Sequence, residues 1–429
     1  MSERSDSRDP SARPPRDVSA RRAVVLVVDA CGVGALPDAA LYGDEGTNTL
    51  AHVAEAVGGL RLPALRSLGL GSIVPLRGVP AVAGPAIHGR LHPLGAGKDS
   101  ISGHWELMGV SLARPLPTFP RGFPPELLER LVDAMGHEAI CNRPDNGLAA
   151  IEEFGSEHVR DGALILYTSQ DSVLQLAAHV DRVPVAELYR ACEAARAAMT
   201  GEHAVGRVIA RPFTGPRGAF VRTEGRRDYA LTPPSRSYLE ELTDAGVPVH
   251  GVGKIHDLFA GVGVAASHPG ATNARALDSV EDLFRELPHG LVLANLIETD
   301  QVYGHRKDVH GFANALAEID ARVGRILERL REGDLLIVTA DHGVDPAHPG
   351  TDHTREYAPL LAVTGEMLAR RRSGDAPGTA GNAGAGDIGG VGNVGGVRHD
   401  GPLADVGASV LRWLAGRDAD DLPGSAFVS

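Results

Sequence analysis

Three separate apolar runs each lead into an aspartate, and this repeated pattern constrains the fold more than any other feature of the sequence. The runs are AVVLVVDACGVG (23–34), GLVLANLIETD (290–300) and DLLIVTADHG (334–343). Short runs rich in valine and leucine are typical of buried parallel strands. The carboxyl ends of such strands lie at one edge of an open α/β sheet, where ligands bind. The pattern therefore predicts that Asp29, Asp300 and Asp341 gather at one edge of a sheet.

Helical periodicity between these runs completes the prediction of an α/β core. Residues 49–57 and 311–331 carry apolar residues at i, i+3 and i+4, as amphipathic helices do. A further strand, VPVHGVGKI, leads to Lys254. We expect a mostly parallel sheet flanked by helices, built from residues 21–112 and 232–429. The 429 residues exceed the roughly 250 to 300 that one hydrophobic core supports, so a second domain is expected.

The character of the sequence changes between residues 113 and 231. LPTFPRGFPP is followed by helix-like ELLERLVDAM, strand-like GALILYTS, a helical segment at 184–200 and strand-like RVIARPF. Because parts of one sheet bound this segment on both sides, we predict an inserted α+β cap domain over the carboxyl edge of that sheet. Residues 1–20 are predicted to be a disordered tail, and the Gly- and Ala-rich segment 372–397 a flexible surface loop.

Composition narrows the possible partners. The formal net charge of -13 argues against nucleic acid and against anionic membranes. No run reaches the roughly 18 apolar residues of a membrane span. The three cysteines, Cys31, Cys141 and Cys192, lack metal-ligand spacing, and we expect them to be reduced in a cytoplasmic protein. An anionic substrate would need local cations or metals, and nothing in the sequence indicates an oligomeric state.

The loop DHGVDPAHPGTDHTRE, residues 341–356, is a candidate metal site. It holds three histidines and three aspartates, which a solvated loop can also contain, so the segment alone does not decide between the two interpretations. Asp300 and His305 follow another predicted strand, and Asp29 follows a third. This carboxylate and imidazole set is large enough for two divalent ions and favours Mn²⁺, Zn²⁺ or Mg²⁺. Two such ions form a known clamp for phosphoryl displacement.

The stretch GKDSISGHWELMG, residues 97–109, places serines before a helix-compatible segment. Ser100 or Ser102 could stand at the helix N-terminus, where backbone N–H groups favour phosphate. A simple N-cap serine is the alternative. Beside two metals, a serine hydroxyl would lose its proton and become a nucleophile. Spacing alone does not choose between the two serines.

Taken together, the motifs resemble those of the phosphopentomutase family, within the alkaline phosphatase superfamily, over residues 23–415. The motifs are DACGVGALPDA, GKDSISGHWELMG, YTSQDSVLQLAAH, GRVIARPF, GRRDYAL, GKIHDLFAG, DQVYGHRKD and ADHGVDPAHPGTDHTREYAPLL. The resemblance implies an alkaline phosphatase-like core with an inserted cap. It also implies an intramolecular phosphotransferase that interconverts ribose (or 2-deoxyribose) 1-phosphate and 5-phosphate.

The resemblance implies roles for individual residues. Ser100 matches the phosphorylated nucleophile. Two Mn²⁺ ions are implied, one held by Asp29, Ser100, Asp341 and His342, the other by Asp300, His305 and His353. The positions that match sugar-phosphate contacts are Ser169, Asp171, Val173, Arg211, Arg226 and Lys254. A sugar bisphosphate such as glucose 1,6-bisphosphate is implied as the activator.

Departures from the family pattern, among them the cap segment RPDNGLAAI, and three rival functions accompany the resemblance. The family usually has threonine where this chain has Ser100, and aspartate where it has Glu298. Serine supplies the same hydroxyl, so we expect activity to be retained. A metal-dependent phosphatase or a cofactor-independent phosphoglycerate mutase would share the core without the cap motifs. A non-catalytic sugar-phosphate sensor would have lost a ligand or the nucleophile, and the sequence retains them all.

Overall fold

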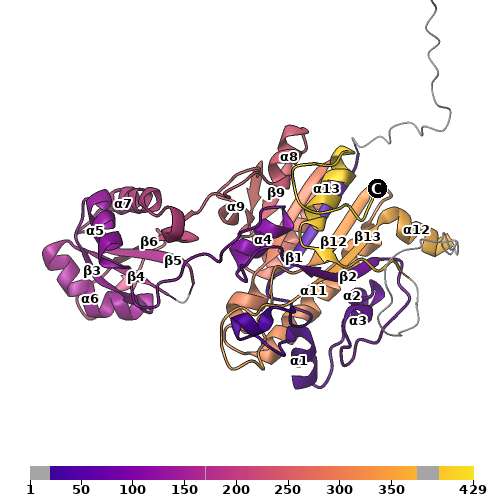
Figure 1. Cartoon of the computed structure of the whole chain (residues 1–429), viewed down its shortest axis with the longest axis horizontal. Helices are drawn as coiled ribbons and strands as arrows, with labels where there is room; N and C mark the ends of the chain where they lie inside the picture. Colours follow the sequence, from indigo (N-terminus) through magenta and orange to yellow (C-terminus); the bar gives the residue numbers. More distant parts are fainter. Residues whose placement is uncertain (1–19, 170, 374–395) are drawn as a thin grey trace, which may run out of the picture.

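The computed structural model describes residues 20–169, 171–373 and 396–429. Most of the predicted tail, and residues 374–395 of the predicted Gly-rich loop, lie outside the described residues. Two separate β-sheets organise the described chain (Figure 1). No helix among these residues is long and apolar enough to cross a membrane.

The larger sheet contains the three predicted strands side by side. Its order is β10 (Ala266–His268), β9 (Val249–Val252), β11 (Gly290–Leu296), β1 (Arg22–Val28), β12 (Asp334–Thr339), β13 (Ala358–Thr364), β2 (Ile87–His92) and β14 (Gly401–Pro402). The central strand β1 runs parallel to β11 and β12. Their carboxyl ends therefore lie at one edge, as predicted. Only β13 runs antiparallel to its neighbours β12 and β2.

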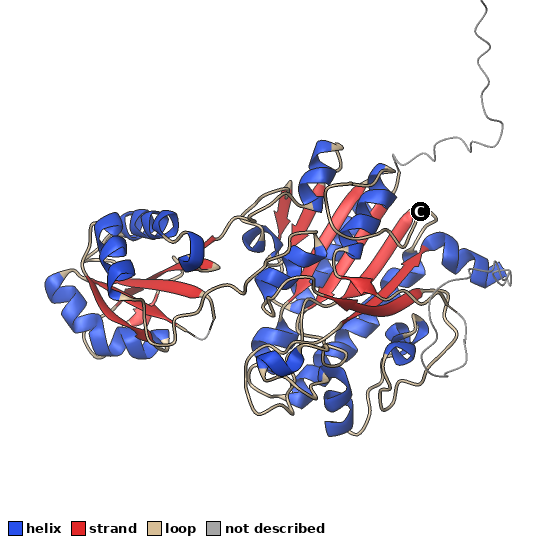
Figure 2. Ribbon diagram, viewed as in Figure 1, coloured by secondary structure: helices blue, strands red, loops and turns tan. Residues whose placement is uncertain are grey.

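Helices cover this sheet, and every residue of β1, β11 and β12 is buried. Side chains alternate between the two faces of a strand, so uniform burial means that both faces are covered. The helices are α1 (Thr49–Ala56), α2 (Pro63–Ser67), α3 (Leu70–Ile73), α4 (Ser100–Leu107), α8 (Tyr238–Asp244), α9 (Ile255–Leu258), α10 (Asn273–Glu286), α11 (Val309–Arg329), α12 (Gly365–Ser373) and α13 (Asp405–Ala415), with short helices at Ala39–Tyr42 and Thr299–Gly304 (η1 and η3). This arrangement confirms the predicted α/β fold class (Figure 2).

Two local predictions differ from the structure in their boundaries. Helix α11 begins two residues earlier than predicted, because the Asp308 side chain caps it by accepting a hydrogen bond from Gly311 N. Lys254 lies beyond β9, at the N-cap of α9. Gly253, with φ of 74°, makes the intervening turn.

The smaller sheet lies between residues 139 and 230. It contains β3 (Ala139–Pro144), β4 (Leu164–Thr168), β5 (Val173–His179), β6 (Arg207–Thr214), β7 (Val221–Arg222) and β8 (Arg227–Ala230). Helices α5 (Pro125–Met135), α6 (Gly147–Asp161), α7 (Val185–Ala198) and η2 (Gly201–His203) accompany it. Its hydrophobic clusters are separate from the core of the larger sheet. All of these elements fall inside the predicted cap, whose boundaries at 113 and 231 remain a prediction.

One face of the smaller sheet is only partly covered by a helix. Leu174 and Val208 pack in the cluster that includes residues of α5 and α7. On the opposite face, α6 covers the part around Tyr167 and Phe213. The rest of that face, around Ile209, lines a cavity toward the larger sheet.

Candidate active site

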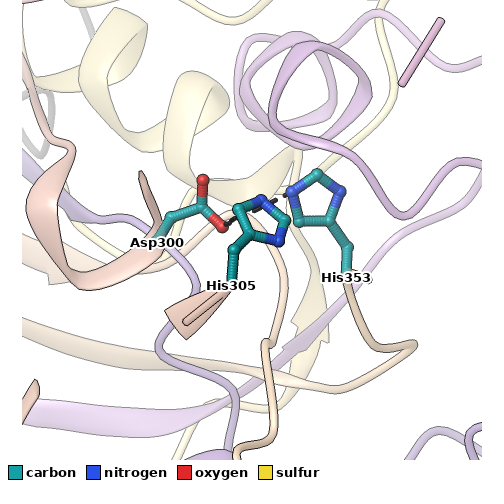
Figure 3. A group of neighbouring side chains, drawn as sticks. All are labelled: Asp300, His305 and His353. Atoms are coloured by element: carbon teal, nitrogen blue, oxygen red, sulfur yellow. Dashed lines mark ion pairs between the residues drawn. The ribbon is translucent and has the colours of Figure 1, made fainter. Parts of the chain in front are cut away.

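Asp300, His305 and His353 form one group of potential metal ligands (Figure 3). Asp300 lies in η3, which follows β11, and His305 ends that helix. His353 comes from the long loop after β12. The Nε2 atoms of His305 and His353 lie 3.3 Å and 3.4 Å from the same oxygen, Asp300 Oδ1. Three side chains from two distant segments thus converge on one point.

The surroundings of this group favour a bound cation. Asp300 Oδ1 and His353 Nε2 are buried and have no hydrogen-bond partner in the described chain. The adjacent Asp300 carboxylate raises the pKa of His305 to about 9. Burial acts to raise the pKa of Asp300, but His305 and His353 lower it below its ordinary value. A proton on His305 compensates the charge of the carboxylate, and a divalent ion would replace it.

Asp29, Asp300 and His342 form a second, fully buried group. His342 Nε2 lies 3.3 Å from Asp29 Oδ1 and 3.3 Å from Asp341 Oδ2. The pKa of Asp29 is raised by burial and then by the charges of Asp341 and Asp300. Asp300 atoms belong to both groups, so the structure brings the two predicted ligand sets together rather than keeping them apart.

The donor set fits divalent metal ions. Three aspartates are buried here within one cluster, and Asp341 Oδ2 has no hydrogen-bond partner in the described chain. Burying several carboxylates is costly unless cations compensate their charge. Oxygen and imidazole ligands without thiolate suit Mn²⁺, Zn²⁺ or Mg²⁺. The residues present therefore fit the implied ions.

The backbone around the cluster is shaped to place these ligands. Ala30, directly after Asp29, has φ of 64°, a left-handed conformation that costs a non-glycine residue about 1 kcal/mol or more. It donates its N–H to Asp341 Oδ1 at 3.2 Å. Gly103 of α4 lies so close to Asp341 that an added Cβ would be 2.5 Å from the Asp341 carbonyl oxygen. Helix α4 can therefore lie directly against the metal-ligand loop.

The two serines of α4 have different surroundings. Ser102 belongs to a capping box: Asp99 Oδ1 accepts a hydrogen bond from Ser102 N at 3.1 Å, and Ser102 Oγ accepts one from Asp99 N at 3.2 Å. Ser100 instead places its Oγ 3.1 Å from His342 Nε2 and 3.4 Å from Asp29 Oδ1. Spacing alone left open which serine belongs to the helix cap and which is the candidate nucleophile. In the structure, Ser102 belongs to the capping box, and Ser100 lies beside the candidate metal ligands.

His104 and Asn295 contact the candidate metal ligands, and the sequence alone predicted a role for neither. His104 Nδ1 lies 3.1 Å from Asp341 Oδ2 and 2.8 Å from the Ser100 carbonyl oxygen. Asn295 Nδ2 donates to Asp29 Oδ2 at 2.9 Å. Burial acts to lower the pKa of His104, but Asp341 raises it overall. The sequence does contain a signal for Asn295, because its polar side chain stands inside the apolar run GLVLANL.

A cavity of about 400 Å³ lies between the two sheets and contains Ser100 in its wall. The six residues predicted to contact substrate all line it: Ser169, Asp171, Val173, Arg211, Arg226 and Lys254. Asp300, His305 and His353 also line it. Sequence reasoning missed Lys98, Gln175 and Arg207, which also face the cavity. The wall thus combines candidate metal ligands with cationic side chains, in a chain whose net charge is -13.

Burial lowers the pKa of two cationic side chains that line the cavity. The pKa of Lys254 is lowered, mainly by burial, although the charge of Asp29 opposes the change. The pKa of Arg211 is lowered by burial and by the neighbouring Arg226. An anionic group in the cavity would offset both effects. The Glu298 carboxylate accepts a hydrogen bond from Asn273 N at 2.6 Å, at the start of α10.

This fold and site define a metal-dependent phosphotransfer enzyme. A family model described as the Metalloenzyme superfamily matches residues 21–415. Phosphopentomutases from Caldanaerobacter subterraneus subsp. tengcongensis and Carboxydothermus hydrogenoformans are 47% and 48% identical to the chain. These matches cover 82% and 80% of the chain, and 90% and 88% of the relatives. The chain therefore belongs to the phosphopentomutase family, which confirms the predicted class of enzyme, an isomerase that transfers a phosphoryl group within its substrate.

Solved structures of more distant proteins are also similar. A Leishmania mexicana phosphoglycerate mutase is 13% identical with a TM-score of 0.47, and the match covers 97% of this chain and 99% of that one. An alkaline phosphatase from the Antarctic bacterium TAB5 is 10% identical with a TM-score of 0.29, over 92% and 97% of the two chains.

Proposed function

We propose that this chain interconverts ribose (or 2-deoxyribose) 1-phosphate and 5-phosphate through a phosphorylated Ser100 and two divalent metal ions. The position of Ser100 is the observation that carries the proposal. Its hydroxyl lies beside buried metal-ligand side chains and also in the wall of a cation-lined cavity. A nucleophile, metal ligands and phosphate-binding cations therefore share one small space.

The metal ligands divide between two ions. Asp29, Ser100, Asp341 and His342 would hold one, and Asp300, His305 and His353 the other, with Mn²⁺ as the proposed metal. When bound, the ions would supply positive charge that lowers the pKa of the Ser100 hydroxyl and stabilises charge on the transferring phosphoryl group. His104 orients Asp341 through an ion pair, and Asn295 orients Asp29 through a hydrogen bond, as outer partners of metal ligands do.

Phosphoryl transfer proceeds in two steps. The free hydroxyl of a pentose monophosphate attacks the phosphorus of phosphorylated Ser100, the Ser100 Oγ–P bond breaks, and the proton of the sugar hydroxyl passes to Ser100 Oγ. The product is a pentose bisphosphate. The Ser100 hydroxyl then attacks the other phosphate, the bond between that phosphate and the sugar oxygen breaks, and the serine proton passes to the sugar oxygen. The phosphate has moved between C1 and C5, and Ser100 is phosphorylated again.

The cap residues hold the phosphate that is not being transferred. Arg211 and Arg226 can donate paired hydrogen bonds to it, and Lys254 adds a cation from the larger sheet. Ser169, Asp171 and Val173 line the same cavity and would contact the sugar. A cap over Ser100 also keeps water from hydrolysing the phosphoserine. A sugar bisphosphate such as glucose 1,6-bisphosphate would phosphorylate Ser100 initially, and we propose a cytoplasmic location.

The test is an assay of the purified protein with Mn²⁺ and ribose 1-phosphate, with and without glucose 1,6-bisphosphate. Ribose 5-phosphate and free phosphate are measured separately. We expect isomerisation with little free phosphate. Phosphate release without isomerisation would instead indicate a phosphatase. Neither product, with metal occupancy verified, would indicate a sugar-phosphate sensor.

A further inference from the structure

The backbone of the loop before α4 is held by side chains from other segments. Residues 94–97 belong to no helix or strand, and Ser100 follows them at the start of α4. The Glu106 carboxylate accepts hydrogen bonds from Leu94 N at 2.7 Å and from Gly95 N at 2.5 Å. Glu106 belongs to the same helix as Ser100 and is only 3% exposed. The N–H groups at the start of the loop are therefore fixed relative to α4.

Arg355 binds the carbonyl groups of the same loop. Its Nη1 donates to the Gly97 carbonyl oxygen at 2.7 Å, and its Nη2 donates to the Gly95 carbonyl oxygen at 2.8 Å. The hydroxyl of Tyr42 donates to the Ala96 carbonyl oxygen between them, at 3.0 Å. The guanidinium of Arg355 also lies over the Tyr42 ring, 4.9 Å from its centroid. One arginine and the tyrosine beside it thus bind three successive carbonyl groups.

Asp38 holds the Arg355 guanidinium in place. Asp38 accepts hydrogen bonds from Arg355 Nη2 at 3.0 Å and from Nε at 3.2 Å. Four of the five N–H groups of the guanidinium therefore have partners within the protein. The Arg355 side chain is only 6% exposed. Arg355 therefore acts through the loop that it binds and not by touching the substrate.

Arg355 also belongs to the loop that supplies a candidate metal ligand. It lies two residues after His353. Asp44, which is 3% exposed, accepts hydrogen bonds at Oδ2 from Arg355 N at 2.8 Å and from Lys98 Nζ at 3.0 Å. Both the backbone and the side chain of Arg355 therefore connect the loop that carries His353 to the loop that leads to Ser100.

The loop 94–97 lies so close to its neighbours that a displacement would reach α4. A Cβ added to Gly95 would lie 2.5 Å from the Leu112 carbonyl oxygen, and one added to Gly97 would lie 2.1 Å from Ser102 Oγ. Ser102 belongs to the capping box at the start of α4. A shift of the loop would therefore shift the first turn of the helix, where Ser100 lies.

We propose that Arg355 is a positioning residue for the nucleophile, because its bonds to the Gly95 and Gly97 carbonyl groups fix the Ser100 hydroxyl relative to His353. Transfer requires the attacking oxygen and the phosphorus to be aligned, and a misplacement of about 1 Å can cost roughly 100-fold in rate. The planar fork of arginine binds two carbonyl groups and a carboxylate at once, which a lysine ammonium does not do in this geometry. The inference rests on the proposed function.

The experiment compares Arg355→Gln with Arg22→Gln in the full-length enzyme loaded with Mn²⁺. Arg22 is a matched control, because it is also 5% exposed, pairs with an aspartate, Asp334, and donates to a backbone carbonyl group, that of Phe284. It lies at the start of β1, at the opposite end of that strand from Asp29. Both substitutions should lower Tm, so activity is measured well below both Tm values.

We expect Arg355→Gln to lower kcat about 10- to 100-fold and to leave the KM for ribose 1-phosphate within about twofold of wild type. Arg22→Gln should leave both constants within about twofold of wild type. Arg355→Lys keeps the charge beside Asp38 without the fork, so its kcat should be intermediate. It is also the variant to measure if Arg355→Gln does not fold. Wild-type kcat in the Arg355 variants, or an equal loss of kcat in Arg22→Gln, overturns the inference.

Hydrogen–deuterium exchange separates this inference from the proposed function, because it requires no turnover. The amides of Leu94, Gly95 and Ala96 are hydrogen-bonded, and a peptide covering residues 94–99 reports on them. Loss of the Arg355 fork should speed their exchange by about tenfold or more, and Arg22→Gln should leave it at the wild-type rate. Faster exchange in the Arg355 variants alone supports the inference even if wild type shows no mutase activity. Unchanged exchange in these variants, or equally fast exchange in Arg22→Gln, overturns it.

Discussion

The clearest prediction concerns the two serines of α4, because the structure gives them opposite roles. Ser100→Ala removes a hydroxyl that lies 3.1 Å from His342 Nε2 but caps no helix. Ser102→Ala removes a hydroxyl that accepts from Asp99 N at 3.2 Å in the capping box. We therefore expect Ser100→Ala to lose activity and keep its stability, and Ser102→Ala to lose stability and keep its activity.

The magnitudes follow from these contacts. Ser100→Ala should lower kcat by roughly 10⁴-fold or more, as loss of a covalent nucleophile does, and change the free energy of unfolding by less than about 0.5 kcal/mol. Ser102→Ala should cost about 1 kcal/mol of stability, equivalent to a fall in Tm of no more than about 4 °C, with turnover near wild type. Ser100→Thr supplies the same hydroxyl and should stay active.

The assay combines turnover, thermal unfolding and identification of the phosphorylated residue. Wild type and both alanine variants are incubated with glucose 1,6-bisphosphate and Mn²⁺, and the peptide covering residues 97–109 is analysed by mass spectrometry. Phosphate should be found on Ser100 in wild type and in Ser102→Ala. Full turnover in Ser100→Ala, or loss of turnover with intact folding in Ser102→Ala, would refute the assignment.

Three further predictions test the site, the core and the cap. Chelation of metal should lower Tm, because the buried carboxylates then repel one another, and excess Mn²⁺ should restore it. Asp300→Asn should reduce the amount of bound metal, measured by elemental analysis, and should weaken the response of Tm to Mn²⁺. Arg22→Ala leaves the Asp334 carboxylate buried and unpaired, and it should lower the free energy of unfolding, measured by chemical denaturation, by about 3 to 5 kcal/mol. Asp300→Asn, by contrast, should change stability only through the loss of bound metal. Burial lowers the pKa of His158 from 6.5, and its Nε2 accepts a hydrogen bond from His179 N, so the unfolded chain binds this proton more readily. Stability should therefore fall as pH drops below about 6.5, and a His158→Gln variant whose stability keeps the same pH slope would contradict this explanation.

Much of the fold was predictable because its signals are local. Apolar runs that end in Asp29, Asp300 and Asp341 indicated parallel strands, and the observed sheet places those strands side by side. Strand ends and helix periodicity depend on neighbouring residues, which a single sequence displays. The same applies to the metal-ligand motifs, whose residues lie within a few positions of a strand end. Helix boundaries were less accurate, since α11 begins where Asp308 can cap it.

The remaining features depend on contacts between segments far apart in the chain. The choice between Ser100 and Ser102 required the orientation of α4 relative to His342, more than 200 residues away. The participation of Asp300 in both ligand groups required the relative positions of three loops. Arg207 and Asp228 meet because β6 and β8 pair in one register, and a shift of one residue would turn the Asp228 side chain to the other face. The sequence by itself thus determined which residues are available for chemistry, whereas tertiary packing and strand register decided which of them meet.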